Sequence, residues 1–119
     1  MSNEFECKCG CKEDFFTPET KEMVNNFLKR INDKAPKDSK FFITSASRCK
    51  KHNKDVGGAT LSSHLTGYAI DISCNNSRER HVILKELMQQ DKIKRIGIGK
   101  NYIHCDFHPV KASNVVWID

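Results

Sequence analysis

The stretch VGGATLSSHLTGYAIDIS, residues 56–73, decides the fold of this chain. Its last six residues alternate as a strand does, so Asp71 faces one way while Ile70 and Ile72 face the other. An unpaired carboxylate in the middle of a strand is costly to desolvate, and it therefore needs a cation or several hydrogen-bond donors. A metal ion is one such cation, and His64 is a suitable co-ligand. The alternative is a hydrogen-bonded loop histidine beside a carboxylate that donors satisfy.

The length and composition of the chain predict one globular domain. Its 119 residues are 38% hydrophobic and 29% charged, which is enough for a single core, so we expect one domain over residues 1–119. Lys and Arg number 20 against 15 Asp and Glu, which gives a net charge of +5. This mild basic excess suits an anionic polymer such as cell wall or nucleic acid. No basic tract is dense enough to favour nucleic acid as the partner.

The N-terminus lacks the charged and apolar regions of a secretion signal, and no later segment has the length and hydrophobicity to span a bilayer. We therefore expect a protein that is made and left in the cytoplasm and does not insert into membranes. We also expect it to be a monomer. In that reducing compartment, the six cysteines are expected to be thiols or metal ligands before disulfides.

Three cysteines alternate near the N-terminus, at Cys7, Cys9 and Cys11. Alternate residues of an extended segment point the same way, so these thiols could meet a fourth partner such as Cys49. The pattern indicates a structural metal or a disulfide. The alternative is a packed N-terminal strand with inert thiols.

The remaining chain alternates helical and extended patterns. Thr17 and Pro18 predict a helix start, and the apolar spacing that follows predicts an amphipathic helix ending before Pro36. A second helix is expected from about Ser77, as its cap, to about Gln90. Strands are expected at residues 41–45, 68–73, 102–108 and 115–118, with a further strand edge from residue 96.

The return strand, residues 102–108, contains IHCDFHP and places His104, Asp106 and His108 on one face. Two strands that each have one polar face can bring His64, Asp71 and His104 together. Two imidazoles and one carboxylate leave a fourth position on zinc open to water, as in catalytic sites.

The motifs SxSRCxxHN at 45–53 and VGGxxxSSHxxGxAxD at 56–71, followed by IGIG and IHxD, resemble those of the zinc D-alanyl-D-alanine carboxypeptidase-like peptidases. These cell-wall enzymes share a fold with the hedgehog signalling domain. The resemblance implies a small α+β domain with a central antiparallel sheet flanked by helices. It also implies that zinc is held by His64, Asp71 and His104, and that the substrate is a peptidoglycan stem or cross-bridge peptide, as for phage endolysins.

Asp106 is the candidate general base, and its alternative role is to orient a ligand imidazole. Several relatives carry an acid three residues before the last histidine ligand, where this chain has Asn101, and an amide cannot accept the proton. His108 is a candidate oxyanion stabiliser or substitute ligand.

Arg48 is a candidate for binding a substrate carboxylate in bidentate fashion, and the alternative is a surface salt bridge. The strand at residues 41–45 delivers Arg48 and His52 towards the glycine loop, so His52 and Ser62 are further candidates for contact with substrate.

We therefore expect a zinc-dependent peptidase that cuts peptidoglycan peptides after a pore or lysis releases it to the cell wall. Two other classes remain open. One is a non-catalytic, hedgehog-like zinc-binding module, and the other is a thiol-rich zinc module that binds nucleic acid. A complete set of His64, Asp71, His104 and Asp106 favours the peptidase.

Overall fold

The computed structural model describes residues 3–119 and contains three α-helices, one 3₁₀ helix and five strands within that range. The first helix has the predicted capping residues: the Thr17 hydroxyl accepts from the Thr20 backbone N–H, and Pro18 occupies the first turn. The elements in chain order are α1 (Pro18–Asp33), β1 (Ile43–Ser45), α2 (Lys50–Asp55), η1 (Ser63–Thr66), β2 (Ala69–Ser73), α3 (Ser77–Gln89), β3 (Arg95–Ile98), β4 (Tyr102–Asp106) and β5 (Val115–Ile118).

The strands form one mixed sheet in the order β1-β2-β4-β3-β5. Neighbouring strands are antiparallel, as expected of the central sheet, except that β5 pairs with β3 in parallel. After β4 the chain reverses once more and returns beside β3 instead of beside β4. The last strand therefore runs in the same direction as β3.

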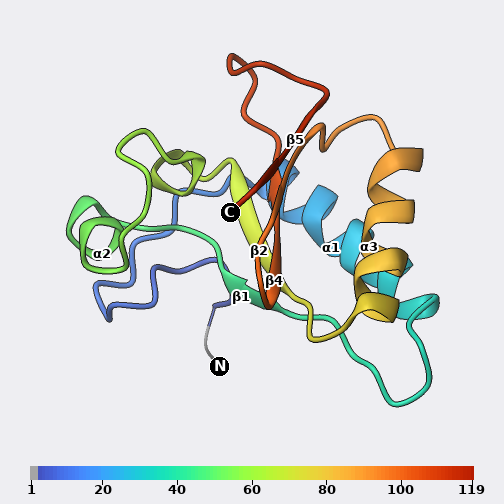
Figure 1. Ribbon diagram of the computed structural model, residues 1–119. Coiled ribbons are helices and arrows are strands. Elements are labelled where there is room, and N and C mark those ends of the chain that lie inside the picture. Colours follow the sequence, from blue (N-terminus) through green and yellow to red (C-terminus); the bar gives the residue numbers. More distant parts are fainter. Residues whose placement is uncertain (1–2) are drawn as a thin grey trace.

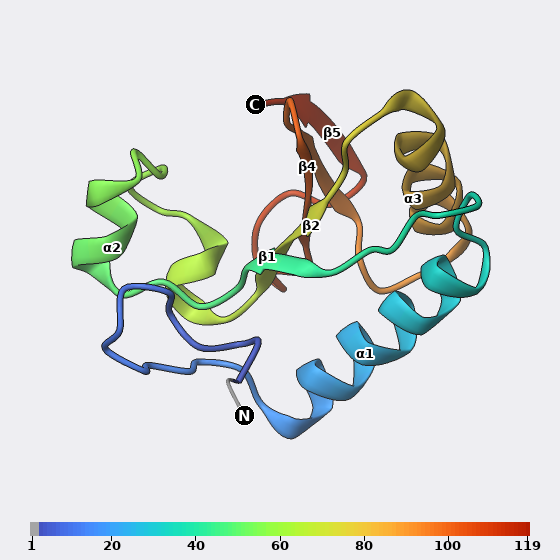
Figure 2. The ribbon, with the colours of Figure 1, turned by 90° about the horizontal axis from the view of Figure 1, so that it is seen from below.

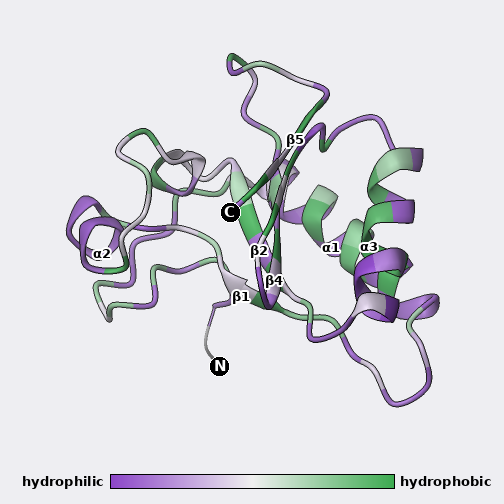
Figure 3. Ribbon diagram, viewed as in Figure 1, coloured by the Kyte–Doolittle hydropathy of each residue, from purple (hydrophilic) through white to green (hydrophobic). Residues whose placement is uncertain are grey.

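Helices α1 and α3 lie together on one side of the sheet, whereas α2 and η1 lie towards the other side (Figures 1 and 2). Apolar and polar segments alternate along α1 and α3, while α2 is strongly hydrophilic (Figure 3). The packed core is therefore between the sheet and the two longer helices. It includes Phe5, Phe16, Val24, Phe27, Ile31, Phe41, Ile43, Ala46, Ile70, Ile72, Cys74, Ile83, Leu87, Ile93, Ile96, Ile103 and Cys105.

The two central strands separate apolar from polar residues as the alternation predicts. Ile70 and Ile72 of β2 belong to the core together with Ile103 of β4. Asp71 and His104 therefore project from the opposite face of the sheet. Every residue of β2 is buried, including the polar Asp71 on the face opposite the core.

Several element ends differ from those predicted, and two of them have a clear cause. The cap of α3 is Asn76 and not Ser77, because the Asn76 side chain accepts from the backbone N–H of Glu79 at 2.9 Å. Strand β4 ends at Asp106, whose carboxylate accepts from the His108 backbone N–H at 3.0 Å and turns the chain. Pro109 follows and has no N–H to donate to a ladder.

Within residues 3–119, no helix combines the length and hydrophobicity that crossing a bilayer requires.

Candidate metal centre

Strand register brings the two central site residues face to face. Asp71 of β2 and His104 of β4 are direct partners across the antiparallel pair. His64 reaches the same place from η1, which the Ser62 hydroxyl caps by accepting from the His64 backbone N–H at 3.2 Å. Gly67 ends η1 with φ of 75°, and a Cβ there would lie 2.4 Å from the Phe15 carbonyl oxygen. Only glycine fits this close approach, which turns the chain from His64 into β2.

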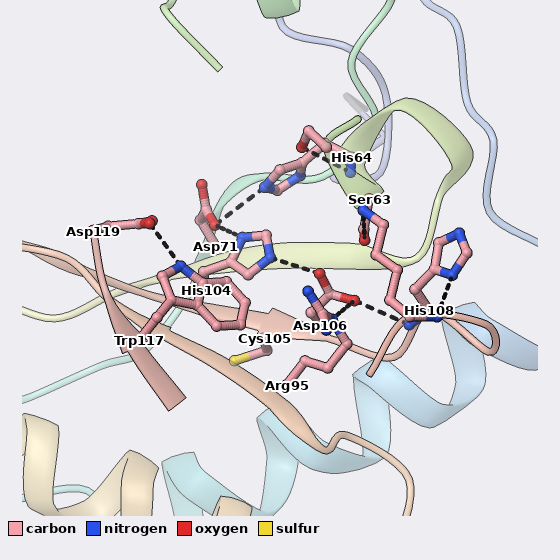
Figure 4. Close-up of polar contacts among 12 residues, drawn as sticks. Ser63, His64, Asp71, Arg95, His104, Cys105, Asp106, His108, Trp117 and Asp119 are labelled. Carbon is pink, nitrogen blue, oxygen red and sulfur yellow. Dashed lines mark hydrogen bonds and ion pairs between the residues drawn. The ribbon is translucent and has the colours of Figure 1, made fainter. Parts of the chain in front are cut away.

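Three atoms that could each ligate a metal ion lie close together at this point (Figure 4). Asp71 Oδ1 lies 3.2 Å from His64 Nε2 and 3.0 Å from His104 Nδ1. Ligand atoms of the three side chains all lie within 4.8 Å of one another. All three residues are buried. The predicted set of two imidazoles and one carboxylate is therefore assembled as a group that could hold a metal ion.

In each imidazole, the ring nitrogen that is turned away from Asp71 contacts a hydrogen-bond acceptor. These acceptors determine which nitrogen of each ring carries the proton. His64 Nδ1 lies 2.6 Å from the Ala46 carbonyl oxygen, which can only accept, so Nδ1 donates. His104 Nε2 lies 3.0 Å from Asp106 Oδ2 and donates to that carboxylate. In neutral rings, the nitrogens that face Asp71 then carry lone pairs. Two lone pairs directed at a carboxylate require protons or a cation between them, which is the donor set that zinc takes.

Charged neighbours fix the two carboxylates of the centre. Arg48 Nη2 donates to Asp71 Oδ2 at 3.3 Å, on the oxygen that does not face the histidines. Arg48 also donates to Ser45 and Asn53, so its guanidinium is held from three sides. Arg95 Nε forms an ion pair with Asp106 Oδ1 at 3.4 Å, but the geometry of this contact is not that of a hydrogen bond. Arg48 is therefore part of the support of Asp71.

The pKa values of the group follow from these contacts. Burial alone would raise the pKa of Asp71, but hydrogen bonds from His104 and His64 outweigh it and hold that pKa well below its usual range. Burial alone would lower the pKa of His104, but the carboxylates of Asp106 and Asp71 raise it to about 9. Burial likewise opposes ionisation of Asp106, whose bonds to His104 and to the His108 N–H lower its pKa to about 2. A metal ion that binds here displaces the proton on His104 Nδ1.

The group lies in the wall of an open cleft of about 530 Å³. Trp117 of β5 packs beside His104, with ring centroids 5.4 Å apart. This is possible because Gly97 of β3 has no side chain, and a Cβ there would lie 2.9 Å from the indole. The residues that line the cleft are Arg48, Val56, Gly57, Gly58, Ala59, Leu61, Ser62, Ser63, His64, Asp71, Arg95, Tyr102, His104, Asp106, Lys111, Trp117 and Asp119.

Asp106 is 2% exposed, and its carboxylate contacts Nε2 of His104. This is the geometry expected of a residue that orients the imidazole of a metal ligand. Its role as general base stays a prediction.

His108 points away from the group in Figure 4, and its Nδ1 accepts from the Val110 N–H at 3.2 Å. His52 of α2 and Asn101 of the β3–β4 turn are also outside the cleft lining, whereas Ser62 is within it.

Sequence reasoning missed the contribution of the C-terminal segment. Asp119 lines the cleft, and its carboxylate accepts from the Tyr102 hydroxyl at 2.7 Å and from the Trp117 indole N–H at 2.8 Å. Lys111 fastens the loop after β4 to η1 by donating to the Leu61 carbonyl and to the Ser63 hydroxyl. No motif marks these residues, because their position depends on β5 pairing with β3.

The four cysteines of the predicted second cluster, Cys7, Cys9, Cys11 and Cys49, do come together, at a place that does not line the cleft.

Comparison with known proteins supports the chemistry of the cleft. A search of curated proteins found no significant match. The family model described as peptidase M15 matches residues 1–106, a range that includes the three candidate ligands and Asp106 but not Asp119. Because this match covers most of the chain, the protein belongs to the peptidase M15 family, whose members are zinc enzymes.

Proposed function

We propose that this protein is a zinc metallopeptidase that hydrolyses peptide bonds in the stem or cross-bridge peptides of peptidoglycan. The observation that carries the proposal is the convergence of His64 Nε2, Asp71 Oδ1 and His104 Nδ1 in the wall of an open cleft. Membership of the peptidase M15 family supports the same chemistry.

His64, Asp71 and His104 would hold the ion, and zinc, when bound, would polarise a scissile carbonyl and lower the pKa of a coordinated water. The protein's own part is to keep these ligands in one protonation state and orientation. The Ala46 carbonyl does so for His64, and the Asp106 carboxylate does so for His104. Each such partner makes its histidine a better metal ligand.

Two carboxylates are candidates for accepting a proton during hydrolysis. Asp106 is engaged with His104 Nε2, on the side of the ring turned away from Asp71. Asp119 is exposed in the cleft, and donors from Tyr102 and Trp117 hold its carboxylate in place. Asp119 is therefore a candidate base alongside Asp106, in a chain that has an amide at position 101.

The cleft suits a short stretch of peptide carrying a carboxylate. Its volume of about 530 Å³ accommodates a few residues, and exposed Leu61 and Val56 line it beside the cationic Lys111. The net charge of +5 favours approach to an anionic wall polymer. The same proposal includes action at the cell wall, by a monomer, after a pore or lysis releases the protein.

The test is digestion of purified peptidoglycan by zinc-loaded protein, with mass spectrometry of the soluble fragments. We expect new amino and carboxyl ends within stem or cross-bridge peptides, and intact glycan strands. The controls are protein treated with a chelator and the Asp71→Ala variant, both of which should release nothing. Fragments that are cut only in the glycan, or equal release by the Asp71→Ala variant, would overturn the proposal.

A further inference from the structure

Four thiols meet between the N-terminal loop and the start of α2. The N-terminal segment runs beside α2 in both ribbon views, although more than 35 residues of chain separate Cys11 from Cys49 (Figures 1 and 2). The Sγ atom of Cys7 lies 3.5 Å from that of Cys9 and 3.8 Å from that of Cys49, and Cys9 Sγ lies 3.7 Å from Cys49 Sγ. Cys11 completes the group, whose four sulfur atoms are all within 4.8 Å of one another.

These separations match tetrahedral coordination by thiolates. A zinc–sulfur bond of about 2.3 Å places the corners of a regular ZnS₄ tetrahedron about 3.8 Å apart. Bonded sulfur atoms in a disulfide are about 2.05 Å apart and pair thiols two by two. Here each of Cys7, Cys9 and Cys49 is nearly equidistant from the other two. The geometry favours one central ion over a pair of disulfides.

The backbone of the loop is bent so that exposed thiols turn towards one another. Gly10 has φ of 97° and Lys12 has φ of 62°, one on each side of Cys11. A left-handed backbone at a lysine costs of the order of 1 kcal/mol or more and persists where the surroundings hold it. Cys9 and Cys11 are both exposed, so burial of their side chains does not explain the convergence. A shared ligand would.

Backbone donors and nearby lysines suit anionic sulfur. The Cys49 N–H donates to Cys7 Sγ at 3.4 Å, and the His52 N–H donates to Cys49 Sγ at 3.4 Å. Lysine directly follows Cys7, Cys11 and Cys49 in the chain, as Lys8, Lys12 and Lys50. Four thiolates around a divalent cation carry two net negative charges, which these cations partly offset.

We infer that Cys7, Cys9, Cys11 and Cys49 form a second, structural zinc site. Four protein ligands close the coordination sphere, so this site has no position for substrate. Its role is to fasten the N-terminal loop to the segment before α2. That segment carries the Ala46 carbonyl and the Arg48 guanidinium, which support His64 and Asp71 of the cleft.

The test is alkylation of the thiols in wild-type protein with iodoacetamide, read by mass spectrometry residue by residue, after loading with zinc and again after chelation. We expect zinc to protect Cys7, Cys9, Cys11 and Cys49 together, and chelation to release all four. Buried Cys74 and Cys105 are internal controls that should react only on unfolding, whether or not zinc is present. Loading with Co²⁺ instead should give sulfur-to-cobalt charge-transfer absorption, which a site of histidine and carboxylate cannot give.

A variant isolates the second ion. Cys9→Ser with Cys11→Ser changes two exposed side chains, so folding of the core should not depend on it, and bound zinc should fall by about one ion per chain, whatever the cleft holds. Rapid alkylation of the four thiols in the presence of zinc would overturn the inference. So would a loss of two mass units per thiol pair that persists after chelation and disappears on reduction, because that result is a disulfide. These readouts are independent of peptidase activity, so they remain informative whether or not the proposed function is correct.

Discussion

Asp71 and His104 are direct partners across β2 and β4, and Asp71 Oδ1 lies 3.0 Å from His104 Nδ1. The centre therefore depends on strand register, since a shift by one residue would turn one of the two side chains into the core. Ile72 and Ile103, the next pair along the same ladder, are fully buried and fix that register by packing. The hydrophobic core and two of the three candidate metal ligands, Asp71 and His104, are thus specified by one alternating pattern.

The Asp106→Asn variant should bind zinc roughly 10–100-fold more weakly, because an amide orients and polarises His104 less well than a carboxylate does. Activity should return largely to the wild-type level when zinc is saturating. Zinc titration during a peptidase assay makes this measurement. Activity that stays lost at saturating zinc would show instead that Asp106 is the general base.

The Asp119→Asn variant should keep its zinc affinity and lose a factor of about 10²–10⁴ in kcat, because its carboxylate faces the cleft and contacts no ligand histidine. Asp91→Asn is the matched control, since Asp91 is exposed and outside the cleft lining. Equal activity of the two variants would remove Asp119 from the reaction.

Metal-free protein should lose stability as the pH rises from 6.5 to about 9. The folded state raises the pKa of His104 from 6.5 to about 9, so the proton it holds stabilises the fold fully below pH 6.5, and this stabilisation is lost as the pH rises through 9. The loss should be on the order of 3 kcal/mol in the free energy of unfolding. Zinc takes the place of the proton, so zinc-loaded protein should not show this loss.

Urea unfolding at the two ends of this pH window measures the effect. The His104→Gln variant, which has no ring to titrate, separates it from other groups, such as the N-terminal thiols. A pH dependence that is the same in metal-free wild type and in metal-free His104→Gln would contradict the assignment.

Two glycines with nearly equal backbone angles should respond differently to alanine. Gly67 has φ of 75° and a new Cβ would lie 2.4 Å from the Phe15 carbonyl oxygen, whereas Gly57 has φ of 72° and nothing within 4 Å. Gly57→Ala should cost about 1 kcal/mol in the free energy of unfolding, from backbone strain alone. Gly67→Ala should cost clearly more, about 3 kcal/mol, because the turn must also move. Chemical denaturation of both variants tests this, and equal costs would refute the close-approach argument.

Much of the fold, and the residues of the candidate ligand set, could be predicted from local pattern. The Thr17-Pro18 start of α1 and the alternation that separates Asp71 from Ile70 and Ile72 are confirmed, because caps and two-residue periodicity act over short distances. The mixed sheet could not be predicted in the same way. Pairing of β5 with β3 depends on packing between distant segments, and so does the presence of Asp119 in the cleft.

Two local features could not be predicted from the sequence pattern either: the capping residue of α3 and the short helix α2. Asn76 and Ser77 are both good capping residues, so the sequence alone does not decide between them, and the structure shows that Asn76 accepts from the Glu79 N–H. The short helix α2 has no apolar periodicity to reveal it, since its sequence is KKHNKD. Its cap is the Cys49 side chain, so its start is tied to the thiol cluster.

Anomalous diffraction at the zinc edge from crystals of the zinc-loaded protein tests the central claim most directly. The account predicts an ion in the cleft bonded to His64 Nε2, Asp71 Oδ1 and His104 Nδ1 at about 2.0–2.2 Å, with a fourth position facing the cleft. A cleft without an anomalous peak at saturating zinc would contradict it. So would a peak bonded to the opposite ring nitrogens of the two histidines.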